Sequence, residues 1–121
     1  MKIGLIGAGR LGICLALLIE KAGYEVLASD NRVDYINSLQ KGIINTAEPE
    51  VQQYLSDAKN IEFTTDNIRV ISECDLIFTL VATPSLADGS YDVSAVWKVI
   101  DDFKDIPILL DEKSLVIGCT T

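Results

Sequence analysis

The chain contains no histidine, and this absence removes several classes of enzyme at once. Ser-His-Asp and Cys-His catalytic arrangements both need an imidazole, and most transition-metal sites use one as a ligand. The cysteines are few as well: Cys14, Cys74 and Cys119 are odd in number and show no CxxC spacing. Neither a disulfide framework nor a zinc site is indicated, so we expect reduced, buried thiols and no bound metal.

Positive charge is also scarce. Ten Lys and Arg residues stand against eighteen Asp and Glu residues, which gives a formal net charge of −8. Nucleic acids and anionic membranes both require a basic surface, so we expect neither as a partner. No apolar run reaches the roughly 20 residues of a membrane-spanning helix, and the first residues lack the pattern of a signal peptide. These features predict a cytoplasmic protein.

The composition that remains is that of one apolar domain. Of the 121 residues, 49% are hydrophobic, and the mean hydropathy is +0.29. Hydrophobic spacing typical of strands alternates with spacing typical of helices. We expect strands at residues 2–6, 25–29, 60–64, 75–81 and 114–119, and helices at 10–22, 32–41, 49–57, 66–73 and 92–104. This order predicts an α/β fold of the Rossmann type, a doubly wound, mainly parallel sheet with helices on both faces.

Two details of that fold are also expected. The run at 75–81 is the most continuous apolar stretch, so we predict a central strand that is buried on both faces. Ligands of such sheets bind beyond the carboxyl ends of the strands, where the strand order reverses. We therefore expect the site between the first and fourth strands.

A glycine-rich loop joins the first predicted strand to the first predicted helix. It reads Gly7-x-Gly9-x-x-Gly12, the fingerprint of a dinucleotide-binding turn. Gly7 permits the tight turn, Gly9 lets the backbone approach a pyrophosphate, and Gly12 lets the helix pack closely on the strand. The amino end of the helix would present unpaired amide groups to the phosphates, so the loop can hold an anion without a lysine.

Asp30 ends the second predicted strand, eighteen residues after Gly12. A carboxylate there can accept the ribose hydroxyl protons of adenosine and would repel a 2′-phosphate, which favours NAD over NADP. A plain helix cap is the alternative role for Asp30. Arg32 leaves the choice between NAD and NADP open, because a guanidinium at this position can stack on adenine or tolerate a phosphate.

Three further segments carry a family resemblance: Ala47-Glu48-Pro49-Glu50-Val51, Val81-Ala82-Thr83-Pro84-Ser85, and Asp88-Gly89-Ser90-Tyr91-Asp92-Val93-Ser94. Together with the glycine loop they resemble the amino-terminal, NAD-binding domain of UDP-glucose/GDP-mannose dehydrogenases. The resemblance implies an NAD-dependent oxidation of the C6 alcohol of a nucleotide sugar to a carboxylate, as in polysaccharide biosynthesis. Two hydride transfers would be separated by a covalent thioester on a cysteine.

The resemblance also implies roles for individual residues. The pyrophosphate would be covered by Gly7, Gly9, Arg10, Leu11 and Gly12. Asp30 would hold the ribose, with Arg32 assisting at the adenosine, and Thr83 would lie near the nicotinamide half. Thr120 matches a threonine that positions catalytic water and also contacts the cofactor. Gly118 and Cys119 depart from the family pattern there, because they replace a lysine and a serine.

The family's catalytic cysteine motif does not occur in this chain. We therefore expect residues 1–121 to be a partial NAD-binding domain, without the central helix and the carboxyl-terminal substrate domains. Alone it should bind NAD weakly or not at all and should not turn over. Its nucleotide sugar would be reached through the missing domains of a homodimer or higher homo-oligomer.

Two other readings stay open at this point. A free-standing regulatory module that senses NAD or ATP would also fit the short length. Alternatively, the chain is an excised piece that mainly exposes apolar surface and an open sheet edge.

Overall fold

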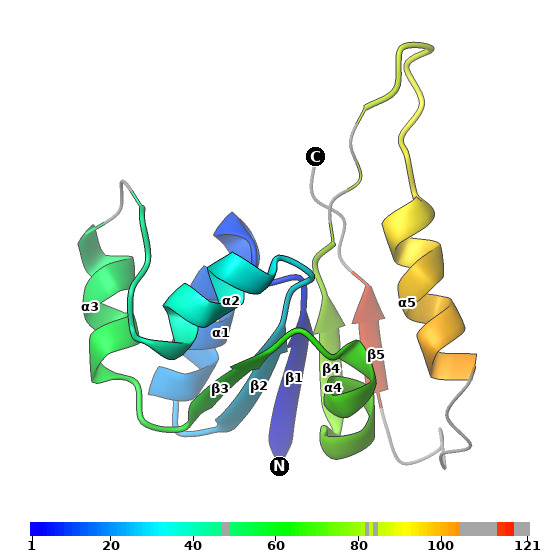
Figure 1. Cartoon of the computed structure of the whole chain (residues 1–121). Helices are drawn as coiled ribbons and strands as arrows, with labels where there is room; N and C mark the ends of the chain where they lie inside the picture. Colours follow the sequence, from blue (N-terminus) through cyan, green and yellow to red (C-terminus); the bar gives the residue numbers. More distant parts are fainter. Residues whose placement is uncertain (47–48, 82, 84, 105–113, 118–121) are drawn as a thin grey trace.

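A computed structural model describes residues 1–46, 49–81, 83, 85–104 and 114–117 of the chain. Within them, five parallel strands form one sheet in the order β3-β2-β1-β4-β5 (Figure 1). The strands are β1 (Lys2–Ile6), β2 (Glu25–Ser29), β3 (Ile61–Thr64), β4 (Leu76–Thr79) and β5 (Ser114–Ile117). The chain therefore has the doubly wound parallel sheet that the alternation of elements predicts.

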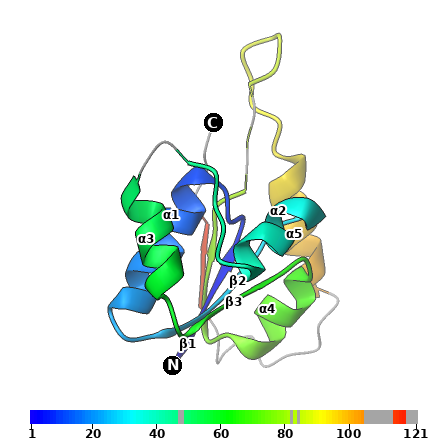
Figure 2. The ribbon, with the colours of Figure 1, turned by 60° about the vertical axis from the view of Figure 1, so that its left-hand side comes forward.

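Helices cover both faces of this sheet. They are α1 (Arg10–Lys21), α2 (Val33–Gln40), α3 (Pro49–Asp57), α4 (Asn67–Glu73) and α5 (Ser94–Lys104). Figure 2 shows α1 and α3 on one side of the sheet and α4 and α5 on the other. The connection from β3 to β4 changes face, and the strand order reverses between β1 and β4. A ligand crevice is expected at that reversal.

The alternation of side chains along the strands divides the core in two. Leu5 packs with α1, α2 and α3, whereas its neighbour Ile6 packs with α4 and α5. Both are essentially inaccessible, and burial of such a side chain contributes about 1.5–3 kcal/mol. Gly4 is part of the same packing, because an added Cβ there would lie 2.7 Å from a methyl group of Val70 and 2.9 Å from Cys74 Sγ. A side chain at position 4 would push α4 off the sheet.

Most predicted elements occur within two residues of the expected bounds, and two differ in an informative way. The strand predicted at 75–81 is an interior parallel strand as expected, because β4 pairs with β1 on one side and β5 on the other, but it is shorter and ends at Thr79. Its residues alternate between half-buried and buried rather than being buried on both faces. The predicted helix at 92–104 begins at Ser94 because the Asp92 carboxylate accepts a hydrogen bond from Ser94 N, 3.0 Å away. Residues 118–119 of the last predicted strand lie outside the described residues.

The hydroxyl of Thr79 is buried without a hydrogen-bond partner among the described residues. A buried hydroxyl that makes no hydrogen bond costs free energy, and valine has nearly the same shape without it. We expect Thr79→Val to raise the free energy of unfolding by about 1 kcal/mol. Chemical denaturation of both forms measures this, with Thr64→Val on a half-buried side chain as control. A loss of stability in Thr79→Val would show that the hydroxyl is bonded.

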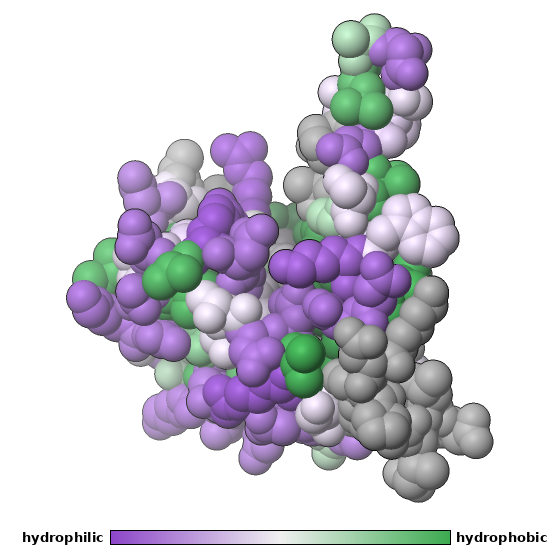
Figure 3. All heavy atoms as spheres, turned by 45° about the vertical axis from the view of Figure 1, so that its right-hand side comes forward, coloured by the Kyte–Doolittle hydropathy of each residue, from purple (hydrophilic) through white to green (hydrophobic). Residues whose placement is uncertain are grey.

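Residues 85–91 project away from the body of the domain (Figure 1). A bridge between Ser85 and Tyr91 and a hydrogen bond from Leu86 N to Ser90 O, 2.7 Å long, close the segment into a hairpin. Figure 3 shows hydrophobic atoms in green on the hairpin and on α5 beside it. The large hydrophobic side chains exposed between residues 85 and 104 include Leu86, Tyr91, Val93 and Trp97. Exposed apolar surface is a feature that the hypothesis of an excised piece expects.

Candidate functional site

A hollow of about 500 Å³ lies at the carboxyl ends of the strands, where the strand order reverses. Five of the residues predicted for the site line it together: Gly7, Gly9, Arg10, Asp30 and Arg32. They come from the loop after β1, the start of α1 and the loop after β2. The topology thus brings together residues that stand more than twenty positions apart in the sequence.

Each glycine of the loop has a different environment. Gly7 has φ +98°, and an added Cβ would lie 2.6 Å from the carbonyl oxygen of Leu80, so both conformation and space require glycine. At Gly12 an added Cβ would lie 2.0 Å from the carbonyl oxygen of Gly7. At Gly9 the nearest atom would be Arg32 Nη2, 3.9 Å away, an ordinary contact. The folded protein needs glycine at positions 7 and 12 but not at position 9.

The start of α1 faces this loop with its amide groups available. The N–H groups of Gly7 and Ala8 donate back to Ser29 O, at 2.8 and 3.1 Å, which fixes the loop against β2. Gly9 is the N-cap residue, and no side chain of the described residues caps this helix end. The first amides of a helix have no partner within the helix, so this end is suited to an anion. Arg10 adds a positive charge at the first helical position.

Asp30 and Arg32 form an ion pair beside the loop. Oδ1 of Asp30 accepts hydrogen bonds from the backbone N and from Nε of Arg32, at 3.0 and 2.8 Å, and Oδ2 accepts one from Nη2 at 3.0 Å. The carboxylate is 9% exposed. Its hydrogen bond to Arg32 raises the pKa of the guanidinium further above its already high value. Arg32 is therefore positively charged at every physiological pH.

Tyr35 holds the Arg32 side chain from the other side. The guanidinium carbon lies 4.2 Å from the centroid of the Tyr35 ring, within the range of a cation–π interaction. The Tyr35 hydroxyl donates to the carbonyl oxygen of Ala8 at 2.5 Å, which ties this stack to the glycine loop. Burial raises the pKa of that phenol. Arg32 is thus oriented by Asp30 on one side and by Tyr35 on the other, and the sequence revealed neither contact.

The pairing limits what Asp30 can accept from a ligand. An ionised carboxylate offers about four acceptor positions, and three hydrogen bonds from Arg32 use all but one of them. In this arrangement one ribose hydroxyl can bond to Oδ2, and a second can do so only if Arg32 moves. The alternative role of Asp30 as a plain helix cap does not fit the geometry, because two of the three hydrogen bonds that its carboxylate accepts come from the Arg32 guanidinium.

The remaining predicted residues lie elsewhere. Leu11 is exposed on the first turn of α1 and does not line the hollow. Gly12 is buried beneath the loop, and Thr83, beyond β4, is also buried and is not part of the lining. Thr120 and Cys119 lie outside the described residues. Among the residues that the structure describes, no group of histidine, cysteine or acidic side chains is placed to hold a metal ion.

Residues of α4 and α5 complete the hollow and were not anticipated. Ala95, Lys98 and Val99 of α5 form part of its wall, as does Asn67, the first residue of α4, whose Oδ1 accepts a hydrogen bond from Ser29 Oγ at 2.7 Å. The helical spacing of the three α5 residues placed them on one face, but the sequence gave no indication of what that face contacts. Lys98 adds a positive charge to the lining that contains Asp30.

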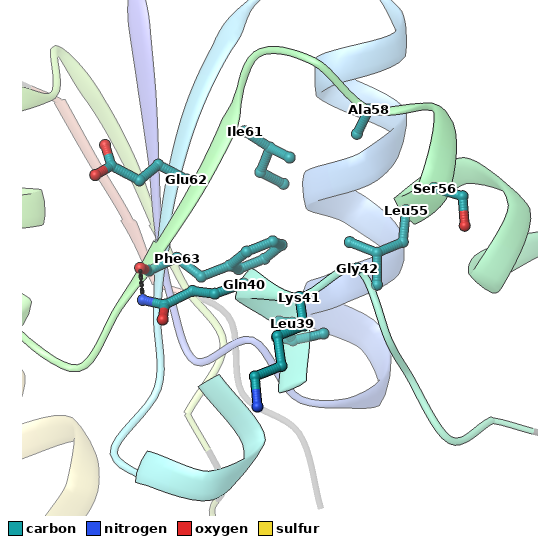
Figure 4. Close-up of a pocket in the computed structure, with 10 residues that line it drawn as sticks. All are labelled: Leu39, Gln40, Lys41, Gly42, Leu55, Ser56, Ala58, Ile61, Glu62 and Phe63. Atoms are coloured by element: carbon teal, nitrogen blue, oxygen red, sulfur yellow. Dashed lines mark hydrogen bonds between the residues drawn. The ribbon is translucent and has the colours of Figure 1, made fainter. Parts of the chain in front are cut away.

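A second hollow, of about 630 Å³, opens at the β3 edge of the sheet and contains none of the predicted site residues. Figure 4 shows Leu39, Leu55 and Phe63 pointing into it, with Gln40 bonded to the Phe63 carbonyl. Its lining mixes apolar side chains with polar ones such as Gln40, Lys41 and Glu62, and the glycine loop does not contribute. Although it is larger, no helix amino end is part of its lining, and such an end is what favours a phosphate in the first hollow.

In the part of the chain that the structure describes, no helix is long and apolar enough to span a membrane.

The sheet order, the glycine turn and the hollow at the strand reversal define a dinucleotide-binding domain of the Rossmann type. Residues 1–121 match the model of the UDP-glucose/GDP-mannose dehydrogenase family, NAD binding domain. The chain belongs to this family, and the cofactor of the domain is NAD.

Individual relatives agree with this assignment. The chain is 30% identical to the UDP-glucose 6-dehydrogenase of Rickettsia bellii over 84% of its own length and 24% of the relative. It is 25% identical to the UDP-N-acetyl-D-mannosamine dehydrogenase of Pyrococcus horikoshii, over 97% of this chain and 28% of the other. A solved ternary complex of GDP-mannose dehydrogenase from Pseudomonas aeruginosa has the same fold, with a TM-score of 0.88 at 23% identity, covering 100% of this chain and 29% of that one. The chain spans about a quarter of the length of the curated relatives it matches.

Proposed function

We propose that the first hollow holds NAD for a nucleotide-sugar 6-dehydrogenase that oxidises the C6 alcohol of its sugar to a carboxylate. The observation that carries this proposal is Gly9, where the protein leaves the space of a side chain empty above an uncapped helix end. None of the residues that the structure describes requires that space, whereas a pyrophosphate that approaches the backbone does. When bound, the nicotinamide supplies the hydride acceptor.

In this proposal, different residues of the hollow bind different parts of NAD. The amides at the start of α1 and the Arg10 side chain neutralise the pyrophosphate, since the helix dipole and the guanidinium both favour negative charge. Asp30 accepts a ribose hydroxyl at its open Oδ2 position. Thr83, beyond the end of β4, is proposed to lie toward the nicotinamide half. Thr120 is proposed to position water and to contact the cofactor, on the strength of its place in the family pattern.

We further propose that residues 1–121 are the cofactor-binding part of the enzyme and that other domains supply the reactive cysteine and the nucleotide-sugar site. The coverage of about a quarter of each relative supports this division. A cytoplasmic homodimer or higher homo-oligomer acting in polysaccharide biosynthesis is the setting that the family resemblance suggests. The exposed apolar side chains of α5 and the projecting hairpin are suited to contact with such further protein.

The test is to express the native gene from start to stop codon and to measure NADH production. We expect NADH from NAD with at least one of UDP-glucose, UDP-N-acetylmannosamine and GDP-mannose, and none from residues 1–121 alone. Absence of NADH with all three sugars would contradict the dehydrogenase assignment. Turnover by residues 1–121 alone would contradict the division of labour, and tighter binding of ATP than of NAD would favour a regulatory module.

A further inference from the structure

The hollow is more positive than an NAD site with a lone carboxylate. Its charged lining, within the described residues, consists of three cations, Arg10, Arg32 and Lys98, and one anion, Asp30. This occurs in a chain whose net charge is −8, so the cations are concentrated here against the overall balance. Arg10 stands at the start of α1, Arg32 is bonded to Asp30, and Lys98 lies on α5.

An unpaired carboxylate after the second strand rejects NADP because it repels the 2′-phosphate. Here the charge of Asp30 is compensated by Arg32 through three hydrogen bonds of 2.8–3.0 Å. The repulsion is therefore largely cancelled before any ligand arrives. The guanidinium remains 57% exposed, and it can offer its remaining N–H groups to a phosphate while still contacting Asp30.

Lys98 supplies the second cation from a different element. It is exposed on α5 and lines the same hollow as Asp30 and Arg32. Its flexible ammonium group can reach a phosphate without displacing Arg32 from Tyr35. Apart from Arg10, which is assigned to the pyrophosphate, the charged lining of the hollow is one carboxylate and two cations, with a formal charge of +1.

On these grounds we propose that this pocket binds 2′-phosphorylated dinucleotides as well as NAD, with Arg32 and Lys98 as the residues that admit the 2′-phosphate. The inference rests on the proposed function, because it requires the ribose to lie at Asp30. It adds NADP, and adenosine 2′,5′-bisphosphate as its minimal portion, to the ligands of the site.

Calorimetric titration of the protein expressed from its full native gene, with NAD and NADP, tests the proposal. We expect the Kd for NADP to lie within about tenfold of that for NAD, because the charge of Asp30 is neutralised. Arg32→Met keeps the aliphatic stem but leaves Asp30 unpaired, so it should widen the ratio of the two constants by about tenfold or more. Lys98→Met should widen it less, and Lys59→Met, which removes an exposed lysine outside the hollow, should leave it unchanged.

Adenosine 3′,5′-bisphosphate controls for non-specific attraction, since it has the charge of the 2′,5′ isomer in the wrong place. Tighter binding of the 2′,5′ isomer, lost in Arg32→Met, is the expected result. An NADP constant more than about tenfold weaker than that of NAD, or a ratio that Arg32→Met does not change, would overturn this inference and leave NAD binding intact. Failure of both dinucleotides to bind would instead overturn the proposed function. Thermal melts of each variant verify that the fold is retained.

Discussion

The Gly12→Ala variant is expected to lose about 3 kcal/mol or more of folding free energy, with a fall in melting temperature of roughly 10 °C. The added Cβ would lie 2.0 Å from the carbonyl oxygen of Gly7 and 3.2 Å from a methyl group of Leu5. A backbone oxygen cannot rotate away as a long side chain can, so α1 must separate from β1. Because α1 buries Ile13, Ala16 and Leu17 against the sheet, that separation exposes core surface.

Thermal and urea denaturation measure the loss. Gly23→Ala is the matched control, because Gly23 follows the end of α1 with φ +107° and has no atom within 4 Å of an added Cβ. Its cost should be limited to the strain of a left-handed conformation, about 1 kcal/mol. Equal stability of Gly12→Ala and the unmodified chain would mean that helix and strand are not as closely packed as the structure places them.

The Gly9→Ala variant is expected to show the opposite pattern, an unchanged fold with strongly weakened NAD binding. Gly9 has φ −73°, which alanine adopts readily, and the nearest atom to its Cβ would be 3.9 Å away. Because alanine is less favourable than glycine at a helix N-cap, we expect a loss of stability of at most about 1 kcal/mol, well below that of Gly12→Ala. The same methyl group would occupy the space through which the pyrophosphate approaches the backbone, so the affinity for NAD should fall at least tenfold, or about 1.4 kcal/mol.

Titration calorimetry of the full native protein with NAD measures the affinity, and thermal denaturation measures the stability. Gly23→Ala again serves as the control, now with the reverse expectation of a lower melting temperature and an unchanged NAD affinity. A Gly9→Ala chain that binds NAD as tightly as the unmodified one would remove the main support for the proposed pyrophosphate position.

The glycine loop illustrates what local sequence determines. The turn, the close packing at Gly12 and the position of Asp30 after the second strand all depend on residues within one βαβ unit, and the pattern predicted them. The order of the strands was harder, because hydrophobicity alone does not distinguish the central strand from its neighbour. The apolar run at 75–81 correctly indicated an interior strand, but it did not show that β1 lies at the middle of the order or that alternate residues of β4 are only half-buried.

The contacts of the charged groups around Asp30 could not be predicted from the sequence. Arg32 was recognised as a residue of uncertain role, and its three bonds to Asp30 depend on side-chain torsions that sequence spacing does not fix. Its stack on Tyr35 follows from the same torsions. Lys98 was missed because it reaches the hollow from α5, more than sixty positions along the chain, through the packing of α5 on the sheet. Contacts between distant elements require the tertiary structure.

An amide-resolved NMR titration of the chain with NAD, up to millimolar concentrations, tests the central claim most directly. The predicted result is that the amide signals of Gly7, Gly9, Gly12 and Asp30 shift together with a single dissociation constant, while those of Leu39 and Phe63 in the second hollow do not move. Shifts centred on the second hollow in place of the glycine loop would contradict the assignment of the loop and Asp30 as the NAD site.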